Sequence, residues 1–160
     1  ADRVIFPVFG EASSAMKYLA EKGLDQLICS LKQPVLGICL GMQLMCASSE
    51  ENNTVCLGIF SEKVKLFPAT DGFKIPHIGW NNIADLKTNL MKGVDENAYM
   101  YFVHSYYVEA CERAIAKTNY IQTYSSALQK DNFYAVQFHP EKSGEAGQRI
   151  LENFINLTIE

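Results

Sequence analysis

The 160-residue chain lacks the features of membrane and nucleic-acid-binding proteins. No apolar run approaches the roughly 20 residues needed to span a bilayer, and no charged-then-apolar leader precedes the first apolar segment. Its 14 lysines and arginines are scattered and the formal net charge is −4. Phosphate binding requires clustered basic side chains, so nucleic acid is not expected as the main partner. We expect a soluble, cytoplasmic protein that binds neither a membrane nor nucleic acid.

The chain also lacks any C-x-x-C pair, and its cysteines are odd in number. Their irregular spacing indicates neither a disulfide framework nor a zinc site. We therefore expect no metal and no organic cofactor. The five cysteines are Cys29, Cys39, Cys46, Cys56 and Cys111.

Repeats, low-complexity tracts and linkers are absent as well, and the composition is that of an ordinary globular protein, with 48% hydrophobic and 20% charged residues. The length is typical of one domain with a sizeable core. We expect residues 1–160 to form a single domain.

Apolar patterning predicts strands that alternate with helices at the start of the chain. This alternating order implies a parallel sheet with helices packed on both faces. The expected segments are a strand at 3–7, helices at 12–22 and 25–31 with Asp25 as the cap of the second, a strand at 34–38, and a helix to about 49.

The middle of the chain favours shorter strands, which we expect to extend the sheet in mixed or antiparallel fashion. A final amphipathic helix is predicted from 145 onward, with apolar residues at helical spacing. The expected strands are 57–60, 64–67, 74–76, 81–86, 99–104, 114–120, 124–128 and 132–138.

Cys39 is the candidate nucleophile, because Gly37-Ile-Cys-Leu-Gly41 is the pattern of a nucleophile elbow. Small residues two positions before and after the nucleophile allow the sharp strand-to-helix turn. A thiol at a helix start also lies near unpaired N–H groups, which favour the thiolate. The alternative is a small buried hydrophobic residue, since free cysteine is often buried.

A second candidate group, His139-Pro140-Glu141, follows the last predicted strand. Residues two apart in an extended segment point to one side, so the histidine and the glutamate can face one pocket. A carboxylate fixes the imidazole tautomer and favours the imidazolium that pairs with a thiolate. Separately, His139 could cap a loop and Glu141 could be a solvated surface residue. Their coincidence with an elbow cysteine favours catalysis.

With these motifs the chain resembles the class I (triad) glutamine amidotransferases, and within them the glutaminase subunits of imidazole glycerol phosphate synthases. The resemblance covers almost the whole chain and implies a three-layer α/β sandwich with a mostly parallel, mixed central sheet. The motifs that carry it are 37–43 (GICLGMQ), 76–81 (PHIGWN), 101–106 (YFVHSY), 131–134 (DNFY) and 137–144 (QFHPEKSG).

The resemblance implies a role for each site residue in glutamine hydrolysis. Cys39 attacks the carboxamide carbon, His139 protonates the leaving ammonia, and Glu141 orients the histidine. The implied oxyanion hole involves Leu40, Phe9 and Gly10, and the implied glutamine contacts are Gly10, Gln43, His104, Ser105 and Tyr106. The alternatives are an exposed helix position for Gln43 and a core position for Tyr106.

A partner is implied too, because ammonia released into neutral water is mostly protonated and no longer nucleophilic. In the family the partner is a cyclase subunit with a (β/α)8 barrel that receives ammonia through a closed channel. Trp80, Tyr101 and Lys142 occupy the positions that face it. The alternative for Trp80 is burial in its own core.

Two departures from the family pattern lead to further expectations. The family's Pro-Gly-Val-Gly is Pro7-Val8-Phe9-Gly10 here. Valine resists the positive φ that glycine allows, so a peptide flip is hindered and we expect weak glutaminase activity. The chain also begins late relative to the family and lacks its N-terminal strand, which predicts a poorly stable monomer.

Two other functions remain open at this point. One is a different enzyme on the same fold, either the glutaminase of another pathway or a γ-glutamyl hydrolase, against which Gly79-Trp-Asn81 and His104-Ser-Tyr106 argue. The other is a catalytically silent protein that only binds or regulates its partner. Val8 favours this second alternative, whereas the complete set of Cys39, His139 and Glu141 opposes it.

Overall fold

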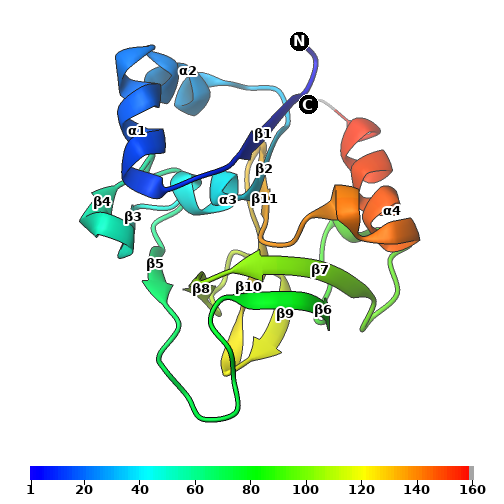
Figure 1. Ribbon diagram of the computed structural model, residues 1–160. Coiled ribbons are helices and arrows are strands. Elements are labelled where there is room, and N and C mark those ends of the chain that lie inside the picture. Colours follow the sequence, from blue (N-terminus) through cyan, green and yellow to red (C-terminus); the bar gives the residue numbers. More distant parts are fainter. Residues whose placement is uncertain (159–160) are drawn as a thin grey trace.

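The computed structural model describes residues 1–158 and shows a three-layer α/β sandwich (Figure 1). A mixed sheet forms the middle layer. Helices α1, α2 and α3 lie on one face and α4 lies on the other. The α/β class and the layering expected from the sequence are confirmed.

The elements follow one another along the chain with these bounds. The N-terminal half contains β1 (Val4–Val8), α1 (Ala12–Glu21), α2 (Leu24–Ser30), β2 (Val35–Cys39), α3 (Leu40–Met45), β3 (Ser48–Ser49), β4 (Thr54–Val55), β5 (Lys63–Leu66) and β6 (His77–Asn82). The C-terminal half contains β7 (Tyr99–His104), β8 (Tyr106–Glu109), β9 (Ala114–Tyr120), β10 (Gln122–Lys130), β11 (Phe133–Val136) and α4 (Gly144–Ile155).

The parallel part of the sheet places the site. Strand β2 lies between β1 and β11 and pairs with both in parallel, so their carboxyl ends meet at one edge. In this register Val8 is opposite Cys39, and Val136 is opposite Ile38. The segments that follow β1 and β11 therefore leave the sheet beside the carboxyl end of β2.

Antiparallel strands extend the sheet beyond β11. Strand β10 pairs with β11, β8 and β9, and β8 continues to β5. Strands β6 and β7 form a separate two-stranded antiparallel sheet instead of extending the main one as expected. That small sheet packs over the end of the main sheet where β11 finishes (Figure 1), and the backbone N–H of His139 donates to the carbonyl of Tyr101 on β7 at 3.0 Å.

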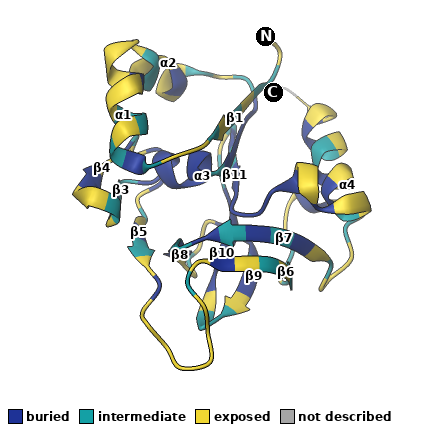
Figure 2. Cartoon of the chain, in the orientation of Figure 1, coloured by how far each residue is buried: buried dark blue, intermediate teal, exposed yellow. Residues whose placement is uncertain are grey.

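Two hydrophobic cores form because successive residues of β2 point to opposite faces. Val35 packs with α1, α2 and α3, whereas Leu36 and Ile38 pack with α4 and the aromatic residues of β7 and β10. All three side chains are buried, and much of the chain at the centre of the main sheet is dark blue in Figure 2. This burial on both faces explains why the segment reads as a continuous apolar run rather than an alternating one.

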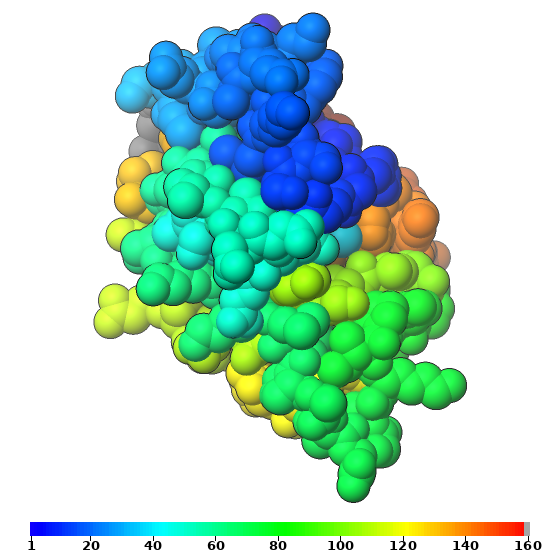
Figure 3. Space-filling view, turned by 60° about the vertical axis from the view of Figure 1, so that its left-hand side comes forward, coloured from blue at the N-terminus to red at the C-terminus, as the bar shows by residue number. Residues whose placement is uncertain are grey.

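The N-terminal helices pack tightly on the segment that follows α3. Figure 3 shows the blue N-terminal segment against the cyan-to-green segment, and helix α1 contacts β4 there. The backbone N–H of Ala12, at the start of α1, donates to Glu51 Oε1 at 2.7 Å. No helix among residues 1–158 is long and apolar enough to cross a membrane.

Several expected element boundaries are wrong. Residues 57–60 and 74–76 are not strands, α3 ends at Met45 instead of continuing to 49, and the strand expected at 81–86 is β6, which ends at Asn82. Strand β8 was not expected. Asp25 lies in the first turn of α2, whose N-cap is Gly23. A short apolar run does not by itself distinguish a strand from a buried loop, which explains the error at 57–60, where Ile59 and Phe60 are buried outside any strand.

Gly41 permits the close approach of α3 to β1. A Cβ atom added to Gly41 would collide with the carbonyl oxygen of Phe6, and one added to Gly37 would lie 3.0 Å from the Gly41 backbone. The two glycines of the elbow are therefore steric requirements of the turn, as its pattern predicted.

We expect Gly41→Ala to lower the free energy of unfolding by about 1–3 kcal/mol, because the added methyl group must push β1 away from α3. Denaturant unfolding measures the change. Glu21→Ala is the control, because Glu21 is an exposed residue of helix α1, where alanine adds no steric contact. A loss for Gly41→Ala no larger than the control's would contradict the close-packing argument.

Candidate active site

Cys39 occupies a strained turn between β2 and α3. Its φ of 56° and ψ of −111° lie outside the regions that non-glycine residues favour, and the residue is the N-cap of α3. Such strain is typical of functional positions, where the surrounding structure holds it in place. The elbow expected from the sequence is present.

His139 and Glu141 form a hydrogen-bonded pair just beyond the carboxyl end of β11. The imidazole is 5% exposed, and its Nδ1–H donates to Glu141 Oε1 at 2.6 Å. The carboxylate thus fixes the tautomer, leaving Nε2 of the neutral ring as a proton acceptor. Because β11 is the parallel neighbour of β2, this pair lies at the same sheet edge as Cys39.

The Cys39 thiol is held by groups other than the imidazole. Sγ donates to the Val103 carbonyl at 3.7 Å and accepts from Gln137 Nε2 at 3.9 Å. Within residues 1–158, the structure shows no hydrogen bond between this thiol and His139. Burial raises the pKa of the thiol to about 11, and the Leu40 N–H opposes this rise only in part. The thiolate expected at this helix start is therefore not favoured here, because desolvation outweighs the N–H groups.

Phe9 and Gly10, expected at the oxyanion hole, directly follow β1 beside the nucleophile. The Phe9 side chain is 75% exposed, and its ring stacks on that of His139 with centroids 6.4 Å apart. Gly10 has a φ of +105°, which only glycine adopts readily. Val8 is the last residue of β1 and faces Cys39 in the register of the parallel pair.

Gln43 is buried, so the exposed helix position considered from the sequence is wrong. Its Nε2 donates to the Tyr106 carbonyl at 3.1 Å and to Gln137 Oε1 at 3.0 Å. The amide oxygen of Gln43 is the remaining side-chain acceptor. Gln43 therefore connects the nucleophile region with the segment after β7.

His104 is a buried residue whose two ring nitrogens are both hydrogen-bonded within the protein. Its Nδ1–H donates to the Tyr106 carbonyl at 2.7 Å, and its Nε2 accepts from the Tyr124 hydroxyl at 3.1 Å. Burial lowers the pKa of His104 to about 3, so the ring is neutral. Any contribution of this stretch to glutamine binding therefore comes from its backbone and from Ser105 and Tyr106, both partly exposed.

Acidic side chains lie on the Tyr106 side of the site. Partial burial raises the pKa of Tyr106, and the carboxylates of Glu51, Glu50 and Glu11 raise it further. Their negative potential suits a positively charged group such as the ammonium of an amino acid. The acidic surroundings of this segment were missed in the sequence, since the glutamates are distant from Tyr106 along the chain.

Trp80 and Tyr101 are opposite one another on β6 and β7, on the outer face of the small sheet. Trp80 is 56% exposed, which excludes the core position considered for it, and its ring contacts that of Tyr101 edge to face at 5.9 Å. Lys142 is exposed, and its charge acts on the Cys39 thiol. Of the three residues expected at a partner interface, Tyr101 and Lys142 thus adjoin the catalytic candidates, and Trp80 contacts Tyr101.

Two further polar residues belong to this region although sequence reasoning gave them no role. Ser143 Oγ donates to the His139 carbonyl at 2.6 Å and accepts from the Tyr101 N–H at 3.0 Å. Gln137 is fully buried between Gln43 and Cys39. Both residues lie in the segment 137–144 around the histidine, which could have pointed to them. A single sequence does not show that their side chains are buried.

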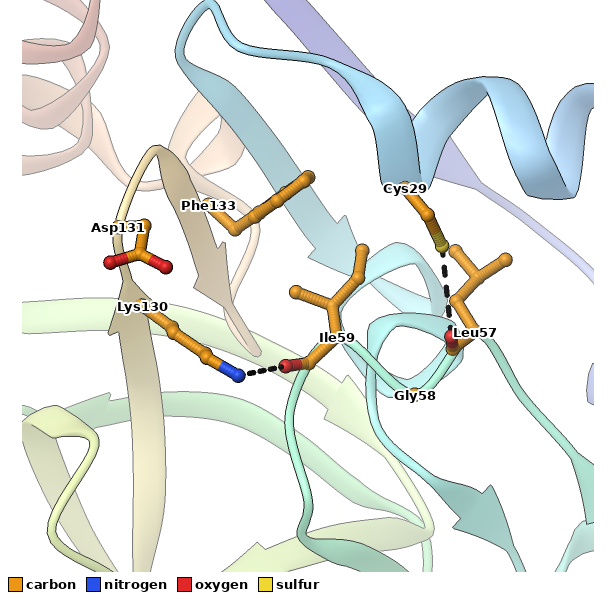
Figure 4. A pocket seen from close by; sticks show the side chains of 7 residues that line it. All are labelled: Cys29, Leu57, Gly58, Ile59, Lys130, Asp131 and Phe133. Carbon is orange, nitrogen blue, oxygen red and sulfur yellow. Dashed lines mark hydrogen bonds between the residues drawn. The ribbon is translucent and has the colours of Figure 1, made fainter.

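Another pocket, with a volume of about 300 Å³, lies at the opposite edge of the sheet (Figure 4). It is lined by Cys29, by residues 57–59 and by residues around the start of β11. Among the last, Lys130 Nζ donates to the Ile59 carbonyl at 3.4 Å. The Cys29 thiol donates to the Leu57 carbonyl at 3.6 Å. This pocket is separate from Cys39, which ends β2 at the other edge. Among residues 1–158, no three His, Cys, Asp or Glu side chains are grouped to hold a metal ion.

A comparison with protein families agrees with this geometry. The family described as glutamine amidotransferase class-I matches residues 2–157. The chain therefore belongs to the class I glutamine amidotransferases, a family of enzymes.

Curated relatives show which members of this family the chain is similar to. The chain is 59% identical over 158 residues to "Imidazole glycerol phosphate synthase subunit HisH" of Bacteroides fragilis (strain YCH46), covering 98% of this chain and 81% of the relative. It is 46% identical over 164 residues to the protein of the same name from Photorhabdus laumondii subsp. laumondii, with the same two coverages.

Solved structures share the fold. A structure described as part of a putative GMP synthase from Thermoplasma acidophilum matches with a TM-score of 0.69 and 20% identity, over 96% of this chain and 71% of that one. A structure titled as a glutamine amidotransferase matches with a TM-score of 0.68 and 15% identity, over 96% and 79% of the two chains. At these identities the likeness concerns the fold.

The raised pKa of Cys39 predicts how the thiol reacts in the isolated protein. Its alkylation by iodoacetamide should accelerate by about tenfold per pH unit between pH 7 and 10, because the thiolate fraction increases in that proportion below the pKa. Mass spectrometry of the Cys39 peptide measures the rate, with exposed Cys29 as the internal reference. A plateau reached below pH 8 would show that an imidazolium already stabilises the thiolate in the resting protein.

Proposed function

We propose that this chain is the glutaminase subunit of an imidazole glycerol phosphate synthase and hydrolyses L-glutamine to glutamate and ammonia. The observation that carries this proposal is the elbow cysteine at the same sheet edge as the buried His139, which is hydrogen-bonded to Glu141. The names of the curated relatives support the synthase and histidine biosynthesis. The 160 residues act as one amidotransferase domain in this proposal, located in the cytoplasm.

The proposed reaction begins when His139 Nε2 takes the proton of the Cys39 thiol. The thiolate attacks the carboxamide carbon of glutamine, and the imidazolium returns the proton to the leaving nitrogen, which departs as ammonia. Water then attacks the glutamyl thioester, releasing glutamate and restoring the thiol. The Glu141 carboxylate stabilises the imidazolium through its 2.6 Å hydrogen bond.

The segments around the thiol bind glutamine and stabilise the negative charge that develops on its carbonyl oxygen. The Leu40 N–H, already directed at Cys39, supplies one oxyanion donor, and the backbone at Phe9 and Gly10 supplies the other. The Gln43 amide oxygen, Ser105 and Tyr106 contact glutamine, while the carboxylates near Tyr106 pair with its ammonium group.

The proposed partner is the cyclase of the synthase, which is a (β/α)8 barrel and uses the ammonia to form imidazole glycerol phosphate and 5-aminoimidazole-4-carboxamide ribonucleotide. Trp80, Tyr101 and Lys142 form the contact surface. Exposed aromatic side chains suit a desolvated interface. The Tyr101 carbonyl accepts the backbone N–H of His139 at 3.0 Å, so a shift of β7 on binding reaches the general base directly.

Three observations favour a second candidate, a partner-binding protein of low activity. The pKa of the Cys39 thiol is raised, and in the part of the chain that the structure describes this thiol has no hydrogen bond to His139. In addition, Val8 stands where the family has glycine. The intact catalytic residues favour the glutaminase instead.

Glutamate release measured in the presence of the cyclase subunit with its nucleotide substrate tests the proposal. We expect turnover in the complex and a loss of at least about 10³-fold in Cys39→Ala, since the nucleophile has no substitute. Cys46→Ala is the control, because Cys46 is a buried cysteine in the core next to α3. Equal rates in Cys39→Ala and Cys46→Ala, or no turnover in the complex, would contradict the proposed glutaminase.

We expect Val8→Gly to raise the kcat of glutamate release in the complex by about tenfold, because glycine lets the peptide after β1 turn its N–H toward the oxyanion. Val8→Ala is the matched control: it shortens the side chain but still disfavours positive φ, so kcat should stay near the wild-type value. An unchanged kcat in Val8→Gly, or an equal gain in both variants, would rule out the backbone explanation.

A further inference from the structure

Gln137 is a fully buried polar residue directly beside the nucleophile. It follows the last residue of β11, and Val136 before it is opposite Ile38 in the parallel register. Its side chain therefore leaves the sheet at the level of Cys39. A buried amide costs free energy unless its hydrogen-bonding groups find partners, so its partners indicate why it is there.

Both ends of the Gln137 amide are engaged within the site. Its Oε1 accepts from Gln43 Nε2 at 3.0 Å, and its Nε2 donates to Cys39 Sγ at 3.9 Å. The amide thus joins the proposed nucleophile to the proposed glutamine contact.

The connection extends into the core. Gln43 Nε2 also donates to the Tyr106 carbonyl, which accepts from His104 Nδ1 as well. The neutral imidazole of His104 is in turn held by the Tyr124 hydroxyl. Because each group in this series has a defined donor or acceptor role, Gln137 is held through Gln43 by a chain of hydrogen bonds that ends at the buried His104 and Tyr124.

We propose that Gln137 is a positioning residue that holds the Cys39 sulfur and the Gln43 side chain in one rigid unit. Its Nε2–H hydrogen bond to sulfur strengthens when the thiol loses its proton, because a charged acceptor binds an N–H more strongly than a neutral one. Its Oε1 fixes the Gln43 amide so that the remaining oxygen of Gln43 faces glutamine. This inference rests on the proposed function.

The first test is the pH dependence of Cys39 alkylation by iodoacetamide in the purified protein. Gln137→Met keeps the length of the side chain but removes both hydrogen bonds. We expect the profile of this variant to move to higher pH by roughly 0.5–1 unit, since the thiolate loses a donor. Gln137→Glu replaces the donor by a carboxylate and should move the profile at least as far.

The second test separates the two ends of the amide. In the complex with the cyclase, Gln137→Met should raise the KM for glutamine by about threefold to tenfold, because Gln43 loses one of its two acceptors. Gln137→Glu retains an acceptor for Gln43, so its KM should stay within about twofold of wild type while its kcat falls. General damage to the fold would not split KM from kcat between these two variants.

Ser126→Ala is the matched control. Ser126 is a buried residue of β10 whose Oγ has no hydrogen-bond partner within residues 1–158, and its backbone carbonyl accepts the Gln137 N–H at 2.9 Å. This variant should keep the wild-type alkylation profile and KM. Wild-type profiles in both Gln137 variants would overturn the inference.

The alkylation test does not require turnover, so the two proposals fail separately. A shifted profile in a protein that releases no glutamate would leave Gln137 as the positioning residue and reject the glutaminase. An unshifted profile in a protein that does release glutamate would reject the role of Gln137 alone.

Discussion

The parallel pairing of β2 with β11 is the constraint on which the rest of the structure depends. It places Cys39 and His139, which are far apart in the sequence, at one edge of the sheet. Residues buried on both faces of β2 fix this register, since a slip by one position would exchange Val35 and Leu36 between the two cores. The position of the site therefore follows from the packing of the cores.

Around that pairing the molecule combines a strained backbone at Cys39 with buried, uncharged side chains. The strain at Cys39 is held by close contacts of Gly37 and Gly41, and burial keeps both the thiol and His104 uncharged. Because a protonated thiol is a weaker nucleophile than a thiolate, we expect the isolated protein to hydrolyse glutamine slowly. In the proposed complex, contact at Trp80 and Tyr101 reaches His139 through the backbone hydrogen bond between β7 and the catalytic segment.

The sequence predicted the strands and the candidate catalytic residues better than it predicted the burial and the hydrogen bonds of those residues. Apolar runs identified β1, β2, β7 and β9, and the Gly-x-Cys-x-Gly pattern identified the turn, because these features depend on neighbouring residues. The separate sheet of β6 and β7, the buried position of Gln43 and the raised pKa of Cys39 depend on contacts between distant segments. For the same reason the sequence places Gln137 within the motif at 137–144 but does not predict its hydrogen bonds to Gln43 and Cys39.

The most direct measurement is a crystal structure of the complex after reaction with a diazoketone analogue of glutamine. The account predicts one covalent bond, to the Cys39 sulfur, with His139 Nε2 within hydrogen-bond distance of the sulfur and the Leu40 N–H directed at the analogue's oxygen. An adduct on another cysteine, or one on Cys39 with the imidazole turned away, would contradict the arrangement of the catalytic groups proposed for this chain.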